Sequence, residues 1–279
     1  MKNIVNAQWL SAHINNEDVI IVDCRSSLVD KEEGEKSYMQ GHIPGAYFLN
    51  IHTQLTGEES EHGGRNPLPH IDHFLEAMEM MGVTNEKTIV AYDDNKLYNA
   101  ARLWWQLKYI GFKNIYVLEG GIDHWKDAGY PLSQEVPEKK KGSLTPRIQE
   151  ELLIDVHGVK KGLKRENFII LDARTKERYT GEFEPIDKIG GHIPGARLFP
   201  AHENLKGNGK WKELEQQKER YASVLDKGEV VVYCGSGINA CMNFIALDEL
   251  GQKPKLYVGS WSDWISYEDN PIAKGDKMV

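Results

Sequence analysis

The sequence predicts an α/β fold made of a duplicated domain, in which each copy is a parallel sheet flanked by helices. The first observation behind this prediction is an internal repeat, because Gly41–Ala46 and Gly191–Ala196 are identical over six residues and lie 150 positions apart. The second is that short apolar runs alternate with amphipathic segments in both halves, which is typical of βα units. The third is a polar connection between the halves.

The predicted strands come in matching pairs. Ile20–Arg25 corresponds to Ile169–Arg174, and both segments are apolar runs that end in Asp-x-Arg. A later pair, Thr88–Tyr92 and Val230–Tyr233, is equally apolar. Continuous apolar runs of this length are typical of strands buried on both faces of a parallel sheet.

The predicted helices follow the second pair of strands. Ala100–Ile110 and Ala240–Leu250 each come after a short loop and have the pattern of a helix that covers a sheet. Near the end of each half a further segment repeats, as Gly120-Gly121-x-x-x-Trp125 and as Gly259-Ser260-x-x-x-Trp264. The repeat therefore extends over the length of both halves.

The connection between the halves is predicted near residue 140. The segment Val136–Ser143 is rich in lysine and contains a proline, which suits an exposed linker better than a core element. We therefore predict one domain over residues 1–138 and a second over residues 145–279.

Composition limits the classes of function. The chain of 279 residues is 40% hydrophobic and 27% charged, as in proteins that bury a core, and its net charge of -8 disfavours binding to nucleic acid or an anionic membrane surface. It contains no apolar run near the roughly 20 residues of a membrane-spanning helix. Three cysteines are too few for a disulfide framework, so we expect free thiols and a cytoplasmic location. No metal-binding spacing is present, and we expect no cofactor.

Taken together, the repeated motifs resemble those of the tandem rhodanese family, which includes thiosulfate and 3-mercaptopyruvate sulfurtransferases. The resemblance spans almost the whole chain. It rests on the doubled Asp-x-Arg and Gly-His-Ile-Pro-Gly-Ala segments, the loop Tyr233–Gly237, the Arg102-x-Trp104-Trp105 helix and the closing segment Gly259–Trp264. The resemblance implies two rhodanese-like domains and a sulfurtransferase activity.

Cys234 is the predicted catalytic residue. It ends a buried strand and precedes a glycine-rich loop and a helix, so backbone N–H groups and the helix N-terminus can stabilise its thiolate. The alternative is a small buried core cysteine. At the matching place the first half has Asp93, which cannot form a persulfide, so we predict an inactive first domain and a catalytic second one.

The resemblance also implies a set of substrate-binding residues. Arg178 stands where the family carries a substrate-binding arginine, and its planar guanidinium suits a carboxylate or sulfonate. A second arginine of mercaptopyruvate enzymes is missing from Glu184–Lys188, where Lys188 is the available cation. The predicted loop residues at the site are Gly235, Ser236, Gly237, Ile238 and Asn239, with Asn239 able to cap the following helix.

The loop sequence favours a mercaptopyruvate donor, because Cys-Gly-Ser-Gly resembles that class, while the missing arginine leaves thiosulfate open. Ser236 is either a substrate contact and proton relay or a small turn residue. In the family, that relay draws on an aspartate and a histidine, and the corresponding positions here are His52 and Asn66, which would break the relay.

The remaining cysteines and the repeated histidines have simpler interpretations. Cys24 is expected in the core, and Cys241 either packs there or acts as a resolving thiol. His42 and His192 precede Ile-Pro-Gly in both halves, including the half without a nucleophile. A hydrogen bond that fixes the turn is therefore expected of both histidines.

We therefore expect a sulfurtransferase in which Cys234 takes sulfur from a small donor and passes it to a thiol or cyanide acceptor, with a thioredoxin-like reductant as a further partner. One alternative is a non-catalytic persulfide carrier or sensor. The other is a phosphatase of the same fold, which would need an arginine six residues after the cysteine, where this chain has Ala240.

Overall fold

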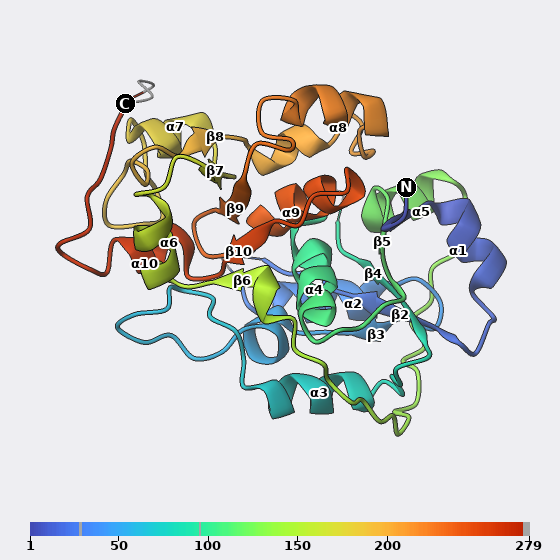
Figure 1. The fold of residues 1–279 in the computed structure, drawn as a ribbon. Coiled ribbons are helices and arrows are strands. Elements are labelled where there is room, and N and C mark those ends of the chain that lie inside the picture. Colours follow the sequence, from blue (N-terminus) through green and yellow to red (C-terminus); the bar gives the residue numbers. More distant parts are fainter. Residues whose placement is uncertain (28–29, 95, 276–279) are drawn as a thin grey trace. The chain divides into compact units, whose positions relative to one another are not determined.

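The structure is a computed structural model that describes residues 1–27, 30–94 and 96–275. The chain forms two compact units (Figure 1). The first comprises Met1–Gly57, Leu68–Gln149 and Leu205–Trp211, and the second comprises Glu58–Pro67, Glu150–Asn204 and the chain from Lys212 onward. Each unit thus includes one short segment from the other half of the sequence. Within the described ranges, every helix is too short or too polar to cross a membrane.

The first unit is built on a parallel sheet with the strand order β1-β5-β4-β2-β3. Its helices and strands are β1 (Ile4–Val5), α1 (Ala7–His13), β2 (Val19–Asp23), α2 (Glu33–Gln40), β3 (Tyr47–Phe48), the π-helix η1 (Ile51–Leu55), α3 (Ile71–Glu79), β4 (Thr88–Tyr92), α4 (Tyr98–Tyr109), β5 (Ile115–Leu118) and α5 (Gly121–Asp127).

The second unit repeats this order as β6-β10-β9-β7-β8, again with parallel strands. Its elements are the 3-10 helix η2 (Glu150–Leu152), β6 (Leu153–Ile154), α6 (Val156–Gly162), β7 (Phe168–Asp172), α7 (Lys176–Thr180), β8 (Arg197–Leu198), the 3-10 helix η3 (Ala201–Asn204), α8 (Leu214–Tyr221), β9 (Glu229–Tyr233), α9 (Ala240–Glu249), β10 (Lys255–Tyr257) and α10 (Ser260–Trp264).

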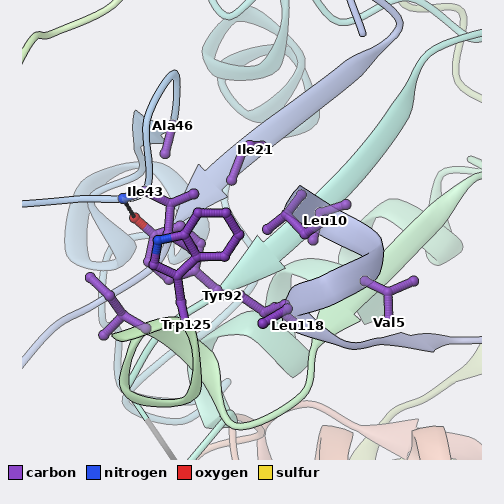
Figure 2. Packing of buried hydrophobic residues seen from close by; sticks show 11 residues of the cluster. Val5, Leu10, Ile21, Ile43, Ala46, Tyr92, Leu118 and Trp125 are labelled. Atoms are coloured by element: carbon purple, nitrogen blue, oxygen red, sulfur yellow. Dashed lines mark hydrogen bonds between the residues drawn. The ribbon is translucent and has the colours of Figure 1, made fainter. Parts of the chain in front are cut away.

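The core of each unit follows from the alternation of side chains along buried strands. Figure 2 shows the cluster on one face of the first sheet, where Leu10 of α1 and Trp125 of α5 pack with Ile21 and Tyr92. The second unit has the equivalent cluster, in which helices α6 and α10 cover β7 and β9. On the opposite faces α4 contacts β4 and β5, and α9 contacts β9 and β10. Helices therefore cover both faces of each sheet, and the predicted α/β fold is confirmed.

The repeated sequence motifs form one hydrogen-bonding arrangement in both units. The arginine of Asp-x-Arg binds its own aspartate and donates to the carbonyl oxygen of the first glycine of Gly-His-Ile-Pro-Gly, from Arg25 to Gly41 at 2.8 Å and from Arg174 to Gly191 at 2.5 Å. The hydroxyl of Tyr92 accepts from the backbone N–H of Ile43 (Figure 2). The motifs are thus explained by the architecture that both halves share.

Candidate active site

Cys234 lies directly after β9, the central strand of the second sheet, and the residue is 3% exposed. It stands at the carboxyl edge of the sheet, where α/β proteins place their ligands. The backbone N–H of Gly237 donates to Sγ of Cys234 at 3.2 Å. Gly237 has a φ of 76° and lies against Val258 so closely that a Cβ would collide with the carbonyl oxygen of Val258. A glycine is therefore needed to point this N–H at the sulfur.

The carbonyl oxygens of the loop are held by α10. The N–H of Trp261 donates to the carbonyl of Cys234 at 3.0 Å, and the N–H of Ser262 donates to that of Gly235 at 2.9 Å. The N–H of Cys234 donates to Oγ of Ser260 at 3.1 Å. Because N–H groups in the first turn of α10 bind these carbonyl oxygens, the oxygens point toward α10 and not toward the sulfur. The loop is thereby fixed around Sγ.

Two arginines converge beside the nucleophile. A Cβ at Gly235 would lie 3.1 Å from Nη2 of Arg178 and 3.3 Å from Nη2 of Arg65. Gly235 thus leaves room for two guanidinium groups next to Cys234. Arg178, on α7, is one of the predicted site residues, whereas Arg65 was not predicted. Two planar cations at one point form a site suited to a carboxylate, sulfonate or thiosulfate group.

Arg65 reaches this site on the segment Glu58–Pro67, which belongs to the second unit. Oδ1 of Asp263 accepts from the N–H of Gly63 at 2.7 Å, and Oγ of Ser262 accepts from the N–H of Arg65 at 3.1 Å. The imidazole of His62 stacks on Tyr267 with 4.0 Å between ring centroids. The segment is therefore tied to α10 and to the residues that follow it, the same region that holds the cysteine loop.

Two carboxylates also face the arginines. Asp187 binds Arg178 through Oδ2 at 2.8 Å and Arg65 through Oδ1. Nε of Arg178 donates a bifurcated hydrogen bond to the two carboxylate oxygens of Glu184, at 2.9 Å to each. Burial raises the pKa of Asp187 despite the opposing effect of the two arginines. Burial acts in the same direction on Glu184, but the hydrogen bond and charge of Arg178 and the backbone N–H groups of Asp187 and Ile186 together outweigh it and lower the pKa of this carboxyl group. The arginine pair is thus balanced by internal negative charge.

Ser236 is paired with an amide. Oγ of Ser236 accepts from Nδ2 of Asn66 at 2.7 Å, so Asn66 does lie at the position from which a relay would act. His52 instead contacts Oγ of Ser26 in the first unit, at 3.2 Å. An amide does not exchange protons near neutrality as an imidazole does, so this pair positions the serine hydroxyl rather than deprotonating it.

For three further predicted site residues, the hydrogen bonds in the described parts of the structure do not involve Sγ of Cys234. Ile238 is 7% exposed and packs in the loop. Asn239 precedes α9 as its N-cap residue, but its side chain makes no capping hydrogen bond, so the expected cap was wrong: its ψ of −28° is helical, whereas a capping residue has extended backbone. Lys188 is exposed, and the neighbouring Asp187 is the residue that turns toward the arginines.

Two segments of the chain, residues 6–128 and 155–267, match the rhodanese-like domain. The chain belongs to the rhodanese family. A relative from Pseudomonas aeruginosa, described as a probable 3-mercaptopyruvate sulfurtransferase, is 36% identical over 98% of both chains. The thiosulfate/3-mercaptopyruvate sulfurtransferase 1 of Arabidopsis thaliana is 27% identical over 96% of this chain and 77% of its own.

The solved structures give the same result for the tandem rhodanese architecture. The crystal structure of SseA from Escherichia coli, a 3-mercaptopyruvate sulfotransferase by its description, superposes with a TM-score of 0.82. It is 30% identical and covers 94% of this chain and 100% of its own. The predicted family, the two tandem rhodanese domains and the enzyme class of sulfurtransferase are thereby confirmed.

The first rhodanese domain carries a carboxyl group where the second carries the thiol. Asp93 follows β4 and accepts hydrogen bonds from the N–H groups of Leu97 at 2.8 Å, Asn99 at 2.8 Å and Ala100 at 3.0 Å. Burial raises the pKa of Asp93 well above its ordinary value, and the three N–H groups oppose this rise. The loop in this domain thus wraps its own side chain, as the loop around Cys234 wraps the sulfur.

The other cysteines and the repeated histidines of the rhodanese domains are buried. Cys24 and Cys241 are both 0% exposed, and Sγ of Cys241 donates to the carbonyl of Gly237 at 3.4 Å. Nδ1 of His42 lies 2.8 Å from the carbonyl oxygen of Tyr38, and Nδ1 of His192 lies 2.8 Å from that of Tyr179. Both histidines therefore make the turn-fixing hydrogen bonds that the sequence predicted. In the described parts of the chain, no cluster of three or more His, Cys, Asp or Glu side chains could hold a metal ion.

Proposed function

We propose that this sulfurtransferase transfers sulfur through a persulfide on Cys234, with 3-mercaptopyruvate as its preferred donor and thiosulfate as the alternative. The Cys234 thiolate attacks the donor sulfur, and the bond between that sulfur and the rest of the donor breaks. The electron pair leaves with the donor residue, as the enolate of pyruvate, which takes up a proton, or as sulfite. A thiol or cyanide then attacks the outer sulfur and releases the Cys234 thiolate.

The observation that carries the proposal is the convergence of Arg65 and Arg178 at Gly235. Both donors have an anionic group close to the sulfur that is transferred: it is bonded directly to that sulfur in thiosulfate and lies a few bonds away in 3-mercaptopyruvate. Two guanidinium groups beside Cys234 can hold such a group and orient the donor for attack. Arg65 thus supplies the second cation that the segment before the Gly-His turn lacks, and Lys188 remains a secondary prediction.

The choice of 3-mercaptopyruvate is supported by the loop and by the relatives. The hydroxyl of Ser236, oriented by Asn66, can donate to a carbonyl or carboxylate oxygen of that donor. Gly235, Gly237, Ile238 and Asn239 complete the loop that we assign to substrate binding. The described function of the Pseudomonas relative is consistent with this assignment.

We further propose one active site per chain, in a catalytic domain over residues 145–279 that is completed by the segment Glu58–Pro67. The domain over residues 1–138 is catalytically inactive because Asp93 replaces the nucleophile. The acceptor is a small thiol or cyanide, a thioredoxin-like reductant can serve as the thiol source, and the protein acts in the cytoplasm.

Steady-state turnover with each donor tests the proposal. Cys234→Ser is expected to abolish sulfur transfer, whereas Cys24→Ala is the matched control, because Ala173 occupies the same position in the second domain. The wild-type protein should have the higher kcat/KM for 3-mercaptopyruvate. Transfer that persists in Cys234→Ser would contradict the proposal, and a persulfide that forms but passes only to a partner protein would favour the carrier function instead.

A further inference from the structure

The arginine pair of the proposed anion site is already occupied by a side chain of this protein. Both oxygens of Asp187 are engaged, one with Arg65 and one with Arg178, and the Asp187 side chain is 3% exposed. Its carboxylate therefore takes the two guanidinium groups in the bridging manner expected of a substrate carboxylate. We propose that Asp187 is a specificity-determining residue, an internal competitor that selects donors of low negative charge. This inference rests on the proposed function of the site.

The charges around the site cancel. Three guanidinium groups (Arg65, Arg174 and Arg178) face three carboxyl groups (Asp172, Glu184 and Asp187) in a connected set of ion pairs. Arg174 and Asp172 bind one another and are almost fully buried, with side chains 1% and 0% exposed. The site thus has two well-placed arginines but no net positive charge. Geometry favours an anion there, while the overall charge does not.

An incoming anion must either displace Asp187 from the arginines or lie beside it. In the first case the charge of Asp187 loses its partners, and in the second the donor is repelled by the carboxylate. The repulsion is proportional to the charge of the donor, so a doubly charged donor such as thiosulfate is disfavoured more than a singly charged carboxylate. Asp187 thereby shifts the preference of the site toward singly charged donors.

Binding of two inert anions tests this charge selection without any sulfur transfer. Sulfate and methanesulfonate both have a tetrahedral sulfur, and methanesulfonate has a methyl group in place of one oxygen, so sulfate is doubly and methanesulfonate singly charged. Their dissociation constants are measured by calorimetry on the full chain carrying Cys234→Ser, with and without Asp187→Asn. Because the electrostatic free energy scales with ligand charge, we expect Asp187→Asn to strengthen sulfate binding about tenfold and methanesulfonate binding about threefold.

Two control variants separate the role of Asp187 from general effects. Glu182 is exposed and belongs to the same segment, so Glu182→Gln removes one negative charge without touching the arginines. It is expected to change both dissociation constants only slightly, since exposed charges are screened by salt. Asp187→Glu keeps the charge and should retain the wild-type preference between the two anions.

The same comparison in turnover uses thiosulfate and methanethiosulfonate, which transfer the same outer sulfur and differ by one charge. Asp187→Asn should raise kcat/KM for thiosulfate more than for methanethiosulfonate, and added salt should reduce the gain. An equal change for both donors, or weaker binding of both anions, would overturn the inference and assign Asp187 to positioning the arginines.

The outcomes also separate this inference from the proposed function. If Cys234 takes up sulfur from no donor, the proposed function fails. The anion measurements on the Cys234→Ser protein would still decide whether Asp187 discriminates by charge.

Discussion

Replacing Gly237 by alanine tests whether the loop geometry around Cys234 controls sulfur transfer. The matched control is Gly251→Ala, in the same unit and just after α9. Gly237 has a φ of 76° and Gly251 a φ of 82°, so both substitutions force alanine into the left-handed region. A Cβ at Gly251 meets nothing within 4 Å, whereas one at Gly237 lies 3.0 Å from Cα of Val258 and collides with its carbonyl oxygen.

The magnitudes follow from these two environments. An alanine in the left-handed region is less stable by about 1–2 kcal/mol. Alanine also makes the unfolded chain less flexible than glycine does, which offsets about 0.4–1 kcal/mol of this cost. Gly251→Ala should therefore lower the free energy of unfolding by about 1 kcal/mol. The collision at Gly237 is about 1 Å inside ordinary C···O contact, and overpacking of this kind costs a further 1–3 kcal/mol or so.

The expected loss of activity at Gly237 is larger than its loss of stability. Moving the loop by about 1 Å would carry the Gly237 N–H away from Sγ, and a displacement of that size can slow a reaction about 100-fold. Urea denaturation gives the stabilities, and rapid-mixing assays of persulfide formation give the rates. The reasoning is refuted if Gly237→Ala and Gly251→Ala form the persulfide equally fast.

Three further predictions concern other parts of the molecule. Arg65→Met and Arg178→Met should each lower kcat/KM for anionic donors about 10- to 100-fold, from the loss of a charged hydrogen bond, while Met at the exposed Arg147 should have no effect. If either Arg65→Met or Arg178→Met retains full activity, the arginine replaced in that variant does not bind the donor. Asp93→Ala should destabilise the protein by about 1–3 kcal/mol in denaturant titrations, because three N–H groups lose their acceptor, and Asp93→Asn should cost less. Burial lowers the pKa of His192 in the folded protein. Below about pH 6.5 the unfolded chain therefore binds more protons at this residue than the folded chain does, and the free energy of unfolding falls. The melting temperature should therefore drop between about pH 7 and pH 5, more steeply in the wild type than in His192→Gln, and identical slopes would exclude this cause.

The fold was predictable because the repeat and the strand pattern carry most of the information about it. Each apolar run that ends in Asp-x-Arg became a buried strand, and the segment Ala100–Ile110 corresponds closely to α4, Tyr98–Tyr109. The two-residue edge strands β1, β3, β6 and β8 were not predicted. Two residues are too few to show the alternation of apolar and polar side chains that marks a strand, and these strands are recognised only by their pairing with neighbouring strands.

The site was predictable only where its residues lie near Cys234 in sequence or in a family motif. Arg65 was missed because it lies 169 positions before Cys234 and has no counterpart in the repeat. Its neighbour Asn66 corresponds to a relay position of the family, so a signal for this segment was present in the sequence. Asp187 was not predicted because the sequence does not tell which charged side chain of Glu184–Lys188 turns inward.

The asparagine before α9 shows a different limit of sequence reasoning. Asn239 is of a residue type that favours N-cap positions, yet here the preceding loop is bent around the sulfur and leaves Asn239 with a helical ψ. The tertiary requirement of the loop therefore overrides the local preference of the residue.

The most direct test of the account is to locate and count the transferred sulfur. The protein is treated with excess donor, and intact-mass and peptide mass spectrometry are performed without added reductant. The account predicts one added sulfur atom per chain, on the peptide that contains Cys234, and none in Cys234→Ser. Sulfur on Cys24 or Cys241, or two sulfur atoms per chain, would contradict it.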